Sequence, residues 1–332
     1  MRRVQQRIAV DGDSHVGEAR RLAASFSRLA ALDERDAGRV AIIATELATN
    51  LHKHAGSGEL LIRELQQGNH TGVEILSVDR GPGMDLAVAL RDGHSTAGTR
   101  GEGLGAVRRL AHEFDVFSAP GGTVLVARVW KGTPPAMAVQ FGAVSLPLPG
   151  EAENGDAWDM RLAASISRLL VVDGLGHGPI AARAAQTAVE AFSGSERLPG
   201  PEAVVHALHG ALRATRGAAV AVAELDLVSR HLRFCGVGNI GALIESPAGH
   251  KTRGLLSHNG IAGHEARRIQ QFDLPWPTRG VLIVHSDGIQ THWKMEAYPG
   301  LQTRHAAVIA GVLYRDYRRK GDDATVVVVK EP

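Results

Sequence analysis

The chain has 332 residues, of which 44% are hydrophobic and 22% charged, and its formal net charge is +2. This is the composition of ordinary folded domains, so it excludes long disorder, collagen-like repeats and a strongly basic nucleic-acid-binding face. The single cysteine, Cys235, excludes a disulfide framework and a cysteine-based zinc site. No apolar stretch approaches the roughly 18 residues of a membrane span, and the first residues lack the apolar core of a signal peptide. We therefore expect a cytoplasmic protein that has neither a membrane nor a nucleic acid as partner.

The clearest break in the chain lies at Lys131–Pro135, where two prolines follow the apolar run 123–130. Paired prolines cannot continue a central strand or a helix, so this segment is predicted to be a linker. At roughly 150 residues per domain the length also predicts two domains. We place them at residues 1–133 and 134–332.

The N-terminal domain is predicted to begin with a short strand and two helices, followed by two strands, a glycine-rich region, a third helix and two closing strands. The expected ranges are strand 7–10, helices 14–31 and 34–54, strands 59–66 and 73–78, and helix 103–112. Helices and strands are grouped rather than strictly alternating. This grouping favours an α+β two-layer sandwich over a doubly wound sheet.

Short apolar strands dominate the C-terminal domain, and helices interrupt them. The expected strands are 138–146, 167–172, 218–225, 232–237, 280–285 and 325–330, and the expected helices are 179–192, 201–213 and 301–314. A pair of packed sheets flanked by helices is the simplest arrangement of these elements.

Three polar motifs occur in order in the N-terminal domain. Glu46 and Asn50 are four residues apart on the second helix, so they share a face, and a carboxylate beside a carboxamide can hold hydrated Mg²⁺. Asp79 ends a predicted strand and is followed by Gly81 and Gly83, which let backbone approach a ligand. The run Gly101–Gly105 opens a helix, where exposed N–H groups suit phosphate. Each motif alone is also explained by a solvated helix face, a turn or a loop, so the ordered combination carries the prediction.

This combination resembles the three sequence boxes of the GHKL ATPases, which have the Bergerat two-layer α/β sandwich. It is most similar to the small serine kinases that phosphorylate anti-sigma-factor antagonists in bacterial stress switches. The resemblance implies that Asp79 binds the adenine amino group, Asn50 contacts Mg²⁺, and Glu46 is the general base for the attacking hydroxyl. The nucleotide-binding residues that it implies are Asn50, Asp79, Gly81, Gly83, Ser95, Thr96, Gly101, Gly103, Leu104 and Gly105.

Four acidic motifs lie at strand ends or turns of the C-terminal domain, and they centre on Asp156, Asp173, Asp287 and the pair Asp322-Asp323. Converging carboxylates are costly unless cations neutralise them. Oxygen ligands without usable cysteine indicate Mg²⁺ or Mn²⁺. Two such ions sharing Asp173 would activate a water for attack on phosphorus. Any single Asp-Gly pair among these motifs is better explained as a turn, so the prediction depends on all four motifs together.

These motifs resemble the metal-dependent protein phosphatases of the PPM family, which have an α-β-β-α sandwich. The run Asp173–Gly178 is similar to the bacterial branch that includes the stage II sporulation phosphatase and the stress-switch phosphatases, as are Gly236–Asn239 and Ser257–Gly260. The resemblance implies that the metal ligands are Asp156, Asp173, Gly174 through its carbonyl, Asp287 and Asp322. The choice of Asp322 over Asp323 depends on sequence register alone.

The two resemblances together predict one polypeptide with opposing activities, using ATP, Mg²⁺ and Mn²⁺. They imply a small switch protein with a STAS domain as the partner whose serine or threonine is phosphorylated and dephosphorylated. Two alternatives stay open. The N-terminal domain could sense ATP or sequester a partner while only the phosphatase turns over, or both domains could be scaffolds that have lost their chemistry.

Overall fold

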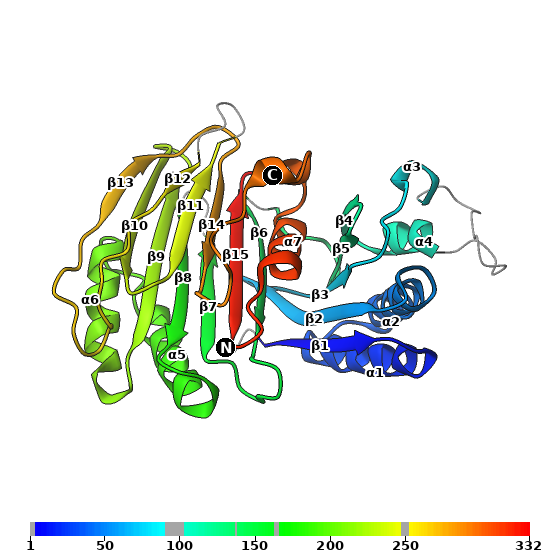
Figure 1. The fold of residues 1–332 in the computed structure, drawn as a ribbon, viewed down its shortest axis with the longest axis horizontal. Coiled ribbons are helices and arrows are strands. Elements are labelled where there is room, and N and C mark those ends of the chain that lie inside the picture. Colours follow the sequence, from blue (N-terminus) through cyan, green and yellow to red (C-terminus); the bar gives the residue numbers. More distant parts are fainter. Residues whose placement is uncertain (1–3, 90–102, 137, 163–165, 247–251) are drawn as a thin grey trace. The chain divides into compact units, whose positions relative to one another are not determined.

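The computed structural model describes residues 4–89, 103–136, 138–162, 166–246 and 252–332. These residues form two compact units (Figure 1). The first unit joins Val4–Ala136 with Thr303–Arg315, and the second joins Met137–Gln302 with Asp316–Pro332. A segment from late in the sequence therefore belongs to the N-terminal unit. None of the helices in the described ranges has the length and apolar character needed to span a bilayer.

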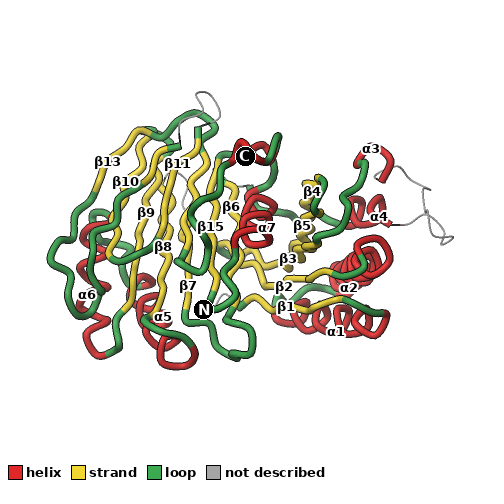
Figure 2. The backbone as a smooth tube through the Cα atoms, viewed as in Figure 1, coloured by secondary structure: helices red, strands yellow, loops and turns green. Residues whose placement is uncertain are grey.

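The N-terminal unit is built on one antiparallel sheet with strand order β1-β2-β3-β5-β4 (Figure 2). Its strands are β1 (Gln5–Val10), β2 (Gly58–Gln67), β3 (His70–Asp79), β4 (Glu113–Ala119) and β5 (Gly122–Trp130). Its helices are α1 (Asp13–Leu29), α2 (Glu34–Asn50), the π-helical turn η1 (Leu51–Ala55), α3 (Leu86–Ala89), α4 (Gly103–Leu110) and most of α7 (Ala306–Tyr317).

One face of this sheet forms a hydrophobic core with α1, α2 and α4. Alternate residues of the strands point to this face, as period-2 geometry requires, and examples are Ile62, Ile75 and Leu125. They pack with Leu47 of α2 and Val107 of α4. The core thus fixes the direction of α2, which carries the first polar motif.

The opposite face of the sheet carries buried charges at its centre. Glu74 accepts hydrogen bonds from Arg63 (Nε to Oε1, 2.7 Å) and from Arg128 (Nε to Oε2, 2.8 Å). Arg128 also contacts Glu113 at 3.1 Å, and the Trp130 indole donates to Glu113 at 2.6 Å. Buried charges of this kind are tolerated only when each has a partner, so this face needs a cover that keeps the network satisfied.

Helix α7 lies across this charged face. At its start, the backbone N–H of His305 donates to Asp115 of β4 at 2.6 Å, and the His305 ring lies 3.2 Å from Glu113. Near its end, the Tyr314 hydroxyl donates to Glu59 of β2 at 2.9 Å. Residues 306–315 are all buried. The sequence predicted this helix but gave no indication that it belongs to the N-terminal sheet.

The second unit contains two five-stranded antiparallel sheets, of order β13-β10-β9-β8-β7 and β12-β11-β14-β15-β6. The strands of the first sheet are β7 (Asp156–Leu162), β8 (Ile166–Gly174), β9 (Ala218–Asp226), β10 (His231–Val237) and β13 (Phe272–Pro275). Those of the second are β6 (Gln140–Leu146), β11 (Gly241–Glu245), β12 (Arg253–Gly254), β14 (Val281–His285) and β15 (Ala324–Lys330).

The two sheets share an apolar core, to which Phe141, Trp158 and Phe234 contribute their rings. The other face of the first sheet packs against α5 (Gly178–Ser193) and α6 (Pro201–Ala211), as Figure 1 shows. The paired sheets and flanking helices agree with the predicted architecture, and the six predicted strands are all present. Strands β7, β11, β12 and β13 were not predicted, because they are short or carry polar residues.

Candidate active sites

The first candidate site begins at the end of α2. Asp33 caps this helix by accepting a hydrogen bond from the Asp36 N–H at 2.8 Å, and the helix then runs without a break to Asn50. Glu46 and Asn50 are both half-buried and lie one turn apart on the same face. The Asn50 Nδ2 atom is buried without a hydrogen-bond partner in the described part of the chain. A buried amide without a partner is costly, so this position suits a bound ligand.

Asp79, at the end of β3, forms the next part of this site. Its Oδ1 accepts hydrogen bonds from the N–H groups of Gly81 (2.8 Å) and Thr123 (3.0 Å). A Cβ at Gly81 would lie 3.0 Å from the Cβ of Ala55, so the turn after β3 packs directly on the π-helical turn that follows Asn50. The two polar motifs are therefore brought together, with the Asp79 side chain oriented by backbone.

The two glycines after Asp79 have a structural role as well. Gly83 has a positive φ of 81°, and a Cβ there would lie 2.5 Å from the Ala119 carbonyl oxygen. Any larger residue would therefore force β4 away from this turn. The third motif lies at the start of α4, where Gly103, Leu104 and Gly105 form the first turn. Ser95, Thr96 and Gly101 lie outside the described residues.

The second candidate site is an acidic cluster in the two-sheet unit. Asp156 and Asp173 are direct partners across the β7–β8 pair. The Asp287 carboxyl group, just after β14, lies close enough to those of Asp173 and Asp322 to raise their pKa values. The four predicted carboxylates thus lie at or next to the ends of four strands, β7, β8, β14 and β15, and face one another in pairs. At Gly174, a Cβ would lie 2.3 Å from the Ala181 carbonyl oxygen, so only glycine fits where the chain enters α5.

Several polar side chains that the sequence did not assign hold these carboxylates. Ser286 Oγ donates to Asp156 Oδ2 at 2.6 Å and accepts from the Thr325 N–H at 3.1 Å. Asn239 Nδ2 donates to Asp287 Oδ2 at 2.8 Å. Ser286 and Asn239 both stood inside motifs that resemble the phosphatase family, and this was the only sequence signal for them.

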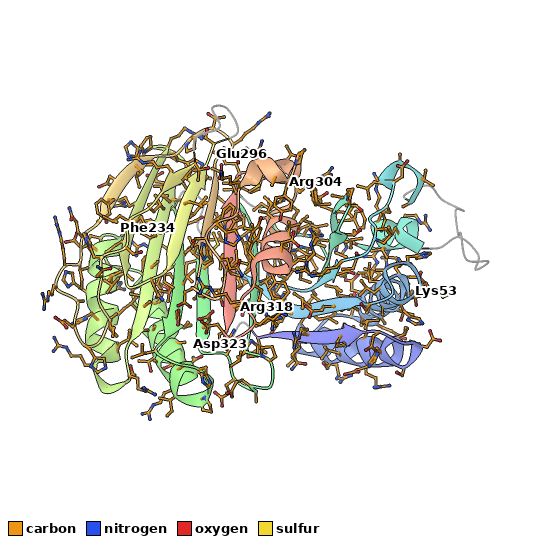
Figure 3. The ribbon with its side chains drawn as sticks, in the orientation of Figure 1. Lys53, Phe234, Glu296, Arg304, Arg318 and Asp323 are labelled. Atoms are coloured by element: carbon orange, nitrogen blue, oxygen red, sulfur yellow. The ribbon has the colours of Figure 1, made fainter. Side chains whose placement is uncertain are left out.

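Asp322 and Asp323 are adjacent but have different surroundings. Asp323 is buried, and its two carboxylate oxygens accept from the N–H groups of Leu148 (2.8 Å) and Gly155 (3.1 Å). Figure 3 shows Asp323 beside the start of β15. Asp322 is half-buried and faces Asp287. Asp323 therefore anchors the loop before β7, and Asp322 is the member of the pair that faces Asp287.

Comparison with known proteins gives two family matches. The model of the histidine kinase-like ATPase domain matches residues 10–129, and that of stage II sporulation protein E (SpoIIE) matches residues 166–331. The serine/threonine-protein kinase RsbT of Bacillus subtilis is 34% identical over 114 residues, which are 34% of this chain and 86% of RsbT.

The chain joins a histidine kinase-like ATPase domain to a SpoIIE domain. The phosphoserine phosphatase RsbX of Bacillus subtilis is 23% identical to it over 154 residues, which are 46% of this chain and 75% of RsbX. A solved structure described under the bacterial stressosome, a system that controls secondary messenger signalling, has 29% identity and a TM-score of 0.54 over 58% of this chain and 99% of that one. RsbX in complex with magnesium, at 19% identity and a TM-score of 0.53, covers 60% of this chain and 98% of that one and shares the fold. Kinase-like ATPase and phosphatase domains of these kinds are typical of stressosome and partner-switch regulators.

The carboxylates of the SpoIIE domain raise each other's pKa. Burial, followed by the charges of Asp156, Asp287 and Asp322, raises the pKa of Asp173 to about 9. Burial and the charges of Asp323 and Asp322 raise the pKa of Asp156 to about 8, against the hydrogen bond from Ser286. Burial and the charge of Asp287 raise the pKa of Asp322 to about 6. The negative charge of the cluster is therefore neutralised either by protons on the carboxyl groups or by bound metal cations.

The donor set of this cluster fits a hard divalent cation. Among the described residues, no three side chains of His, Cys, Asp or Glu already surround one point as a complete metal cage. The carboxylates instead meet in pairs, Asp173 with Asp287 and Asp287 with Asp322. Mg²⁺ and similar ions keep several waters and need only one or two carboxylates each, so paired oxygens suffice.

In the ATPase domain, Asn50 and Asp79 fit a nucleotide in the same sense. The Asn50 amide is buried and lacks a partner in the described ranges, and Asp79 is held by backbone through a single oxygen. ATP binding is implied by the family match. The surroundings of Asn50 and Asp79 agree with it.

Proposed function

We propose that the SpoIIE domain is a metal-dependent phosphatase of phosphoserine and phosphothreonine in proteins. The observation that carries this proposal is the meeting of Asp156, Asp173, Asp287 and Asp322, whose mutual repulsion would be relieved by cations. RsbX, to which the domain is similar, is a phosphoserine phosphatase. When Mg²⁺ or Mn²⁺ is bound, it supplies activation of water and neutralisation of phosphate charge.

The residues of this chain would fix the ligand geometry. Asp156 and Asp173 would hold cations from opposite strands, with the Gly174 carbonyl beside them. Ser286 orients Asp156, and Asn239 orients Asp287. Supporting hydrogen bonds of this kind keep ligands in place and commonly change metal affinity by about 10–100-fold when removed.

The test of this proposal is hydrolysis of a phosphoserine peptide with and without Mn²⁺. The full chain should hydrolyse it only with the metal, and Asp173→Ala should lose nearly all turnover while keeping its fold by circular dichroism. Undiminished, chelator-resistant hydrolysis by Asp173→Ala would refute the metal assignment. Asp273→Ala, which removes an exposed carboxylate on β13, is the matched control.

For the ATPase domain, we propose phosphoryl transfer from Mg-ATP to a serine or threonine of a protein. Asn50 would contact Mg²⁺, Asp79 the adenine, and Glu46 the attacking hydroxyl. The arrangement of Glu46 and Asn50 on one face of α2 supports these roles. The similarity to RsbT, a serine/threonine-protein kinase, supports the reaction.

The protein substrate proposed for both domains is a small STAS-domain switch protein. The support is the resemblance to stress-switch kinases and phosphatases. Purified full chain should transfer labelled phosphate from ATP to such a protein and release it again with Mn²⁺. If the chain binds ATP tightly but phosphorylates no STAS-domain protein, the N-terminal domain is an ATP-sensing or partner-sequestering module instead.

A further inference from the structure

Helix α7 occupies an unusual place in the chain. In sequence it lies between two members of the acidic cluster, after Asp287 and before Asp322. In space, residues 303–315 belong to the ATPase unit. One continuous segment therefore leaves the phosphatase cluster, crosses the ATPase sheet and returns to the cluster.

The contacts of α7 with the ATPase sheet leave little freedom for the helix. Arg304 and His305 bind Asp115 at one end, and Tyr314 binds Glu59 at the other. In the middle, a Cβ at Gly311 would lie 2.6 Å from Val124 Cγ1 and 3.0 Å from Leu76 Cδ2. The helix is therefore in van der Waals contact with β3 and β5. Strand β3 ends at Asp79, and we call the turn that follows it, together with the start of β5, the Asp79 corner.

Arg315, the last residue of the segment 303–315, packs beside the backbone of Asp79, where we propose that the nucleotide binds. A Cβ at Gly122 would lie 2.9 Å from Arg315 Nη1 and 2.1 Å from the Asp79 carbonyl oxygen. Arg315 and Asp79 are therefore packed against the same backbone position. The neighbouring Thr123 N–H donates to the Asp79 carboxylate that we propose binds adenine.

The return of the chain from α7 is tied to the residues that follow Asp287. The Gln290 N–H donates to the Tyr317 carbonyl at 2.9 Å, and the Arg319 N–H donates to the Gly288 carbonyl at 2.8 Å. A Cβ at Gly288 would lie 1.7 Å from the Asp323 carbonyl oxygen. Figure 3 labels Arg318, which lies between Tyr317 and Arg319, and Asp323, which follows in the sequence. The segment leaving α7 therefore holds the backbone of Gly288 and Gln290, just after Asp287, and leads into Asp322.

We propose that α7 couples the two sites, so that an adenine nucleotide bound at the Asp79 corner changes the activity of the acidic cluster. The bound nucleotide alters the packing of Gly122 and Thr123 against Arg315. The C-terminal end of α7 then transmits this change to the bridge, by which we mean the hydrogen-bonded segments 288–290 and 317–319. That bridge sets the separation of Asp287 and Asp322. This inference depends on the proposed nucleotide and phosphatase functions.

The experiment uses the full chain and the non-hydrolysable ATP analogue AMP-PNP. Calorimetry measures binding of the analogue, hydrogen exchange follows the peptide 303–317, and p-nitrophenyl phosphate hydrolysis is measured at a fixed concentration of free Mn²⁺. We expect the analogue to slow exchange in α7 and to change kcat/KM by about fivefold, the lower end of typical allosteric coupling.

Arg315→Ala should bind the analogue and hydrolyse p-nitrophenyl phosphate at the basal rate, but lose the response. Arg319→Ala, which removes an exposed arginine side chain just after α7, is the matched control and should keep the response. If Arg315→Ala does not fold, Tyr314→Phe, which removes the hydroxyl group that donates to Glu59, should weaken the response.

The possible failures are distinguishable. Absence of analogue binding would refute the nucleotide site, and with it the coupling. Absence of metal-dependent hydrolysis would refute the phosphatase. If the analogue binds and the phosphatase works, but neither the exchange of α7 nor the hydrolysis rate changes, the coupling is wrong and the proposed functions stand.

Discussion

Neighbouring aspartates in this protein have separate tasks, which their hydrogen bonds reveal. The Asp323 carboxylate is occupied by two backbone N–H groups, whereas Asp322 faces another carboxylate. We expect Asp323→Ala to lower the free energy of unfolding by about 1–3 kcal/mol, because two backbone N–H donors lose their acceptor. Asp322→Ala should leave stability nearly unchanged or raise it, and should weaken Mn²⁺ binding. Urea unfolding and calorimetric Mn²⁺ titration check both variants, and the reverse pattern would exchange their roles.

Asp173 should make the metal-free protein sensitive to alkaline pH. A carboxyl group whose pKa is raised by folding stabilises the native state while protonated, and this contribution is lost as pH rises toward the folded-state pKa of about 9. Asp173→Asn removes the ionisation. The variant should therefore be more stable than the wild type in EDTA by about 1–3 kcal/mol at pH 8, with the difference shrinking toward pH 5.

Thermal unfolding in EDTA between pH 5 and pH 9 measures this difference, and Asp273→Asn controls for the loss of a surface charge. Mn²⁺ should stabilise the wild type and not Asp173→Asn. A stability difference that does not vary with pH would contradict the raised pKa of Asp173.

Glu46 and Asn50 share a helix face but should differ in function. Removal of a general base typically slows a reaction by about 10²–10⁴-fold and leaves substrate binding intact. Glu46→Ala should therefore bind ATP almost normally and transfer phosphate at least about 100-fold more slowly. Asn50→Ala should fail to bind ATP in the presence of Mg²⁺. Calorimetry and transfer of labelled phosphate to a STAS-domain protein measure the two effects, and equal loss of binding in both variants would show that Glu46 has no separate catalytic role.

At the scale of elements, local sequence patterns predicted the strongly periodic helices and the long apolar strands. Helix α2 and strands β8, β9 and β15 were expected within a few residues of their observed ends. Long-range information was missing from those patterns. The choice between Asp322 and Asp323 depends on bonds to Leu148 and Gly155, which are distant in sequence. The position of α7 depends on Glu59, Asp115 and Val124, so no pattern within the helix itself could have predicted it.

Gly311 of α7 offers a test of this packing in which helix propensity and contact have opposite signs. Alanine is preferred to glycine inside a helix by about 1 kcal/mol, so propensity alone would make Gly311→Ala stabilising. The added methyl group would meet Val124 and Leu76 of the sheet, and overpacking typically costs about 1–3 kcal/mol. We expect net destabilisation, measured by urea unfolding.

Gly210 of α6 is the matched control for this substitution. A Cβ there meets no atom within 4 Å, so Gly210→Ala should stabilise the protein by up to about 1 kcal/mol. If both alanine variants are stabilising, α7 does not pack on β3 and β5 as closely as the structure shows.

At the scale of the whole molecule, the two compact units do not follow the order of residues along the chain, because each unit combines segments that are distant in sequence. The predicted linker at 131–135 lies next to the end of the N-terminal part of the ATPase unit at Ala136, but residues 303–315, far beyond that linker, belong to the same unit. The sheet face under α7 contains the buried ion pairs of Glu74 and Arg128 as well as Leu76 and Val124. A fragment that ends at the linker would expose this face to water.

We therefore predict that fragment 1–136 is less stable than the same fragment joined by a flexible linker to residues 303–317. Burial of a single Val, Leu or Ile side chain contributes about 1.5–3 kcal/mol, and α7 covers both Leu76 and Val124, so the difference should be about 3 kcal/mol or more. Urea unfolding of the two fragments measures it, and a joined segment of the same residues in scrambled order controls for composition. Equal stability of all three would show that the sheet does not need α7. A gain in stability that appears only with the native order would show that α7, which lies in the SpoIIE half of the sequence, stabilises the ATPase unit.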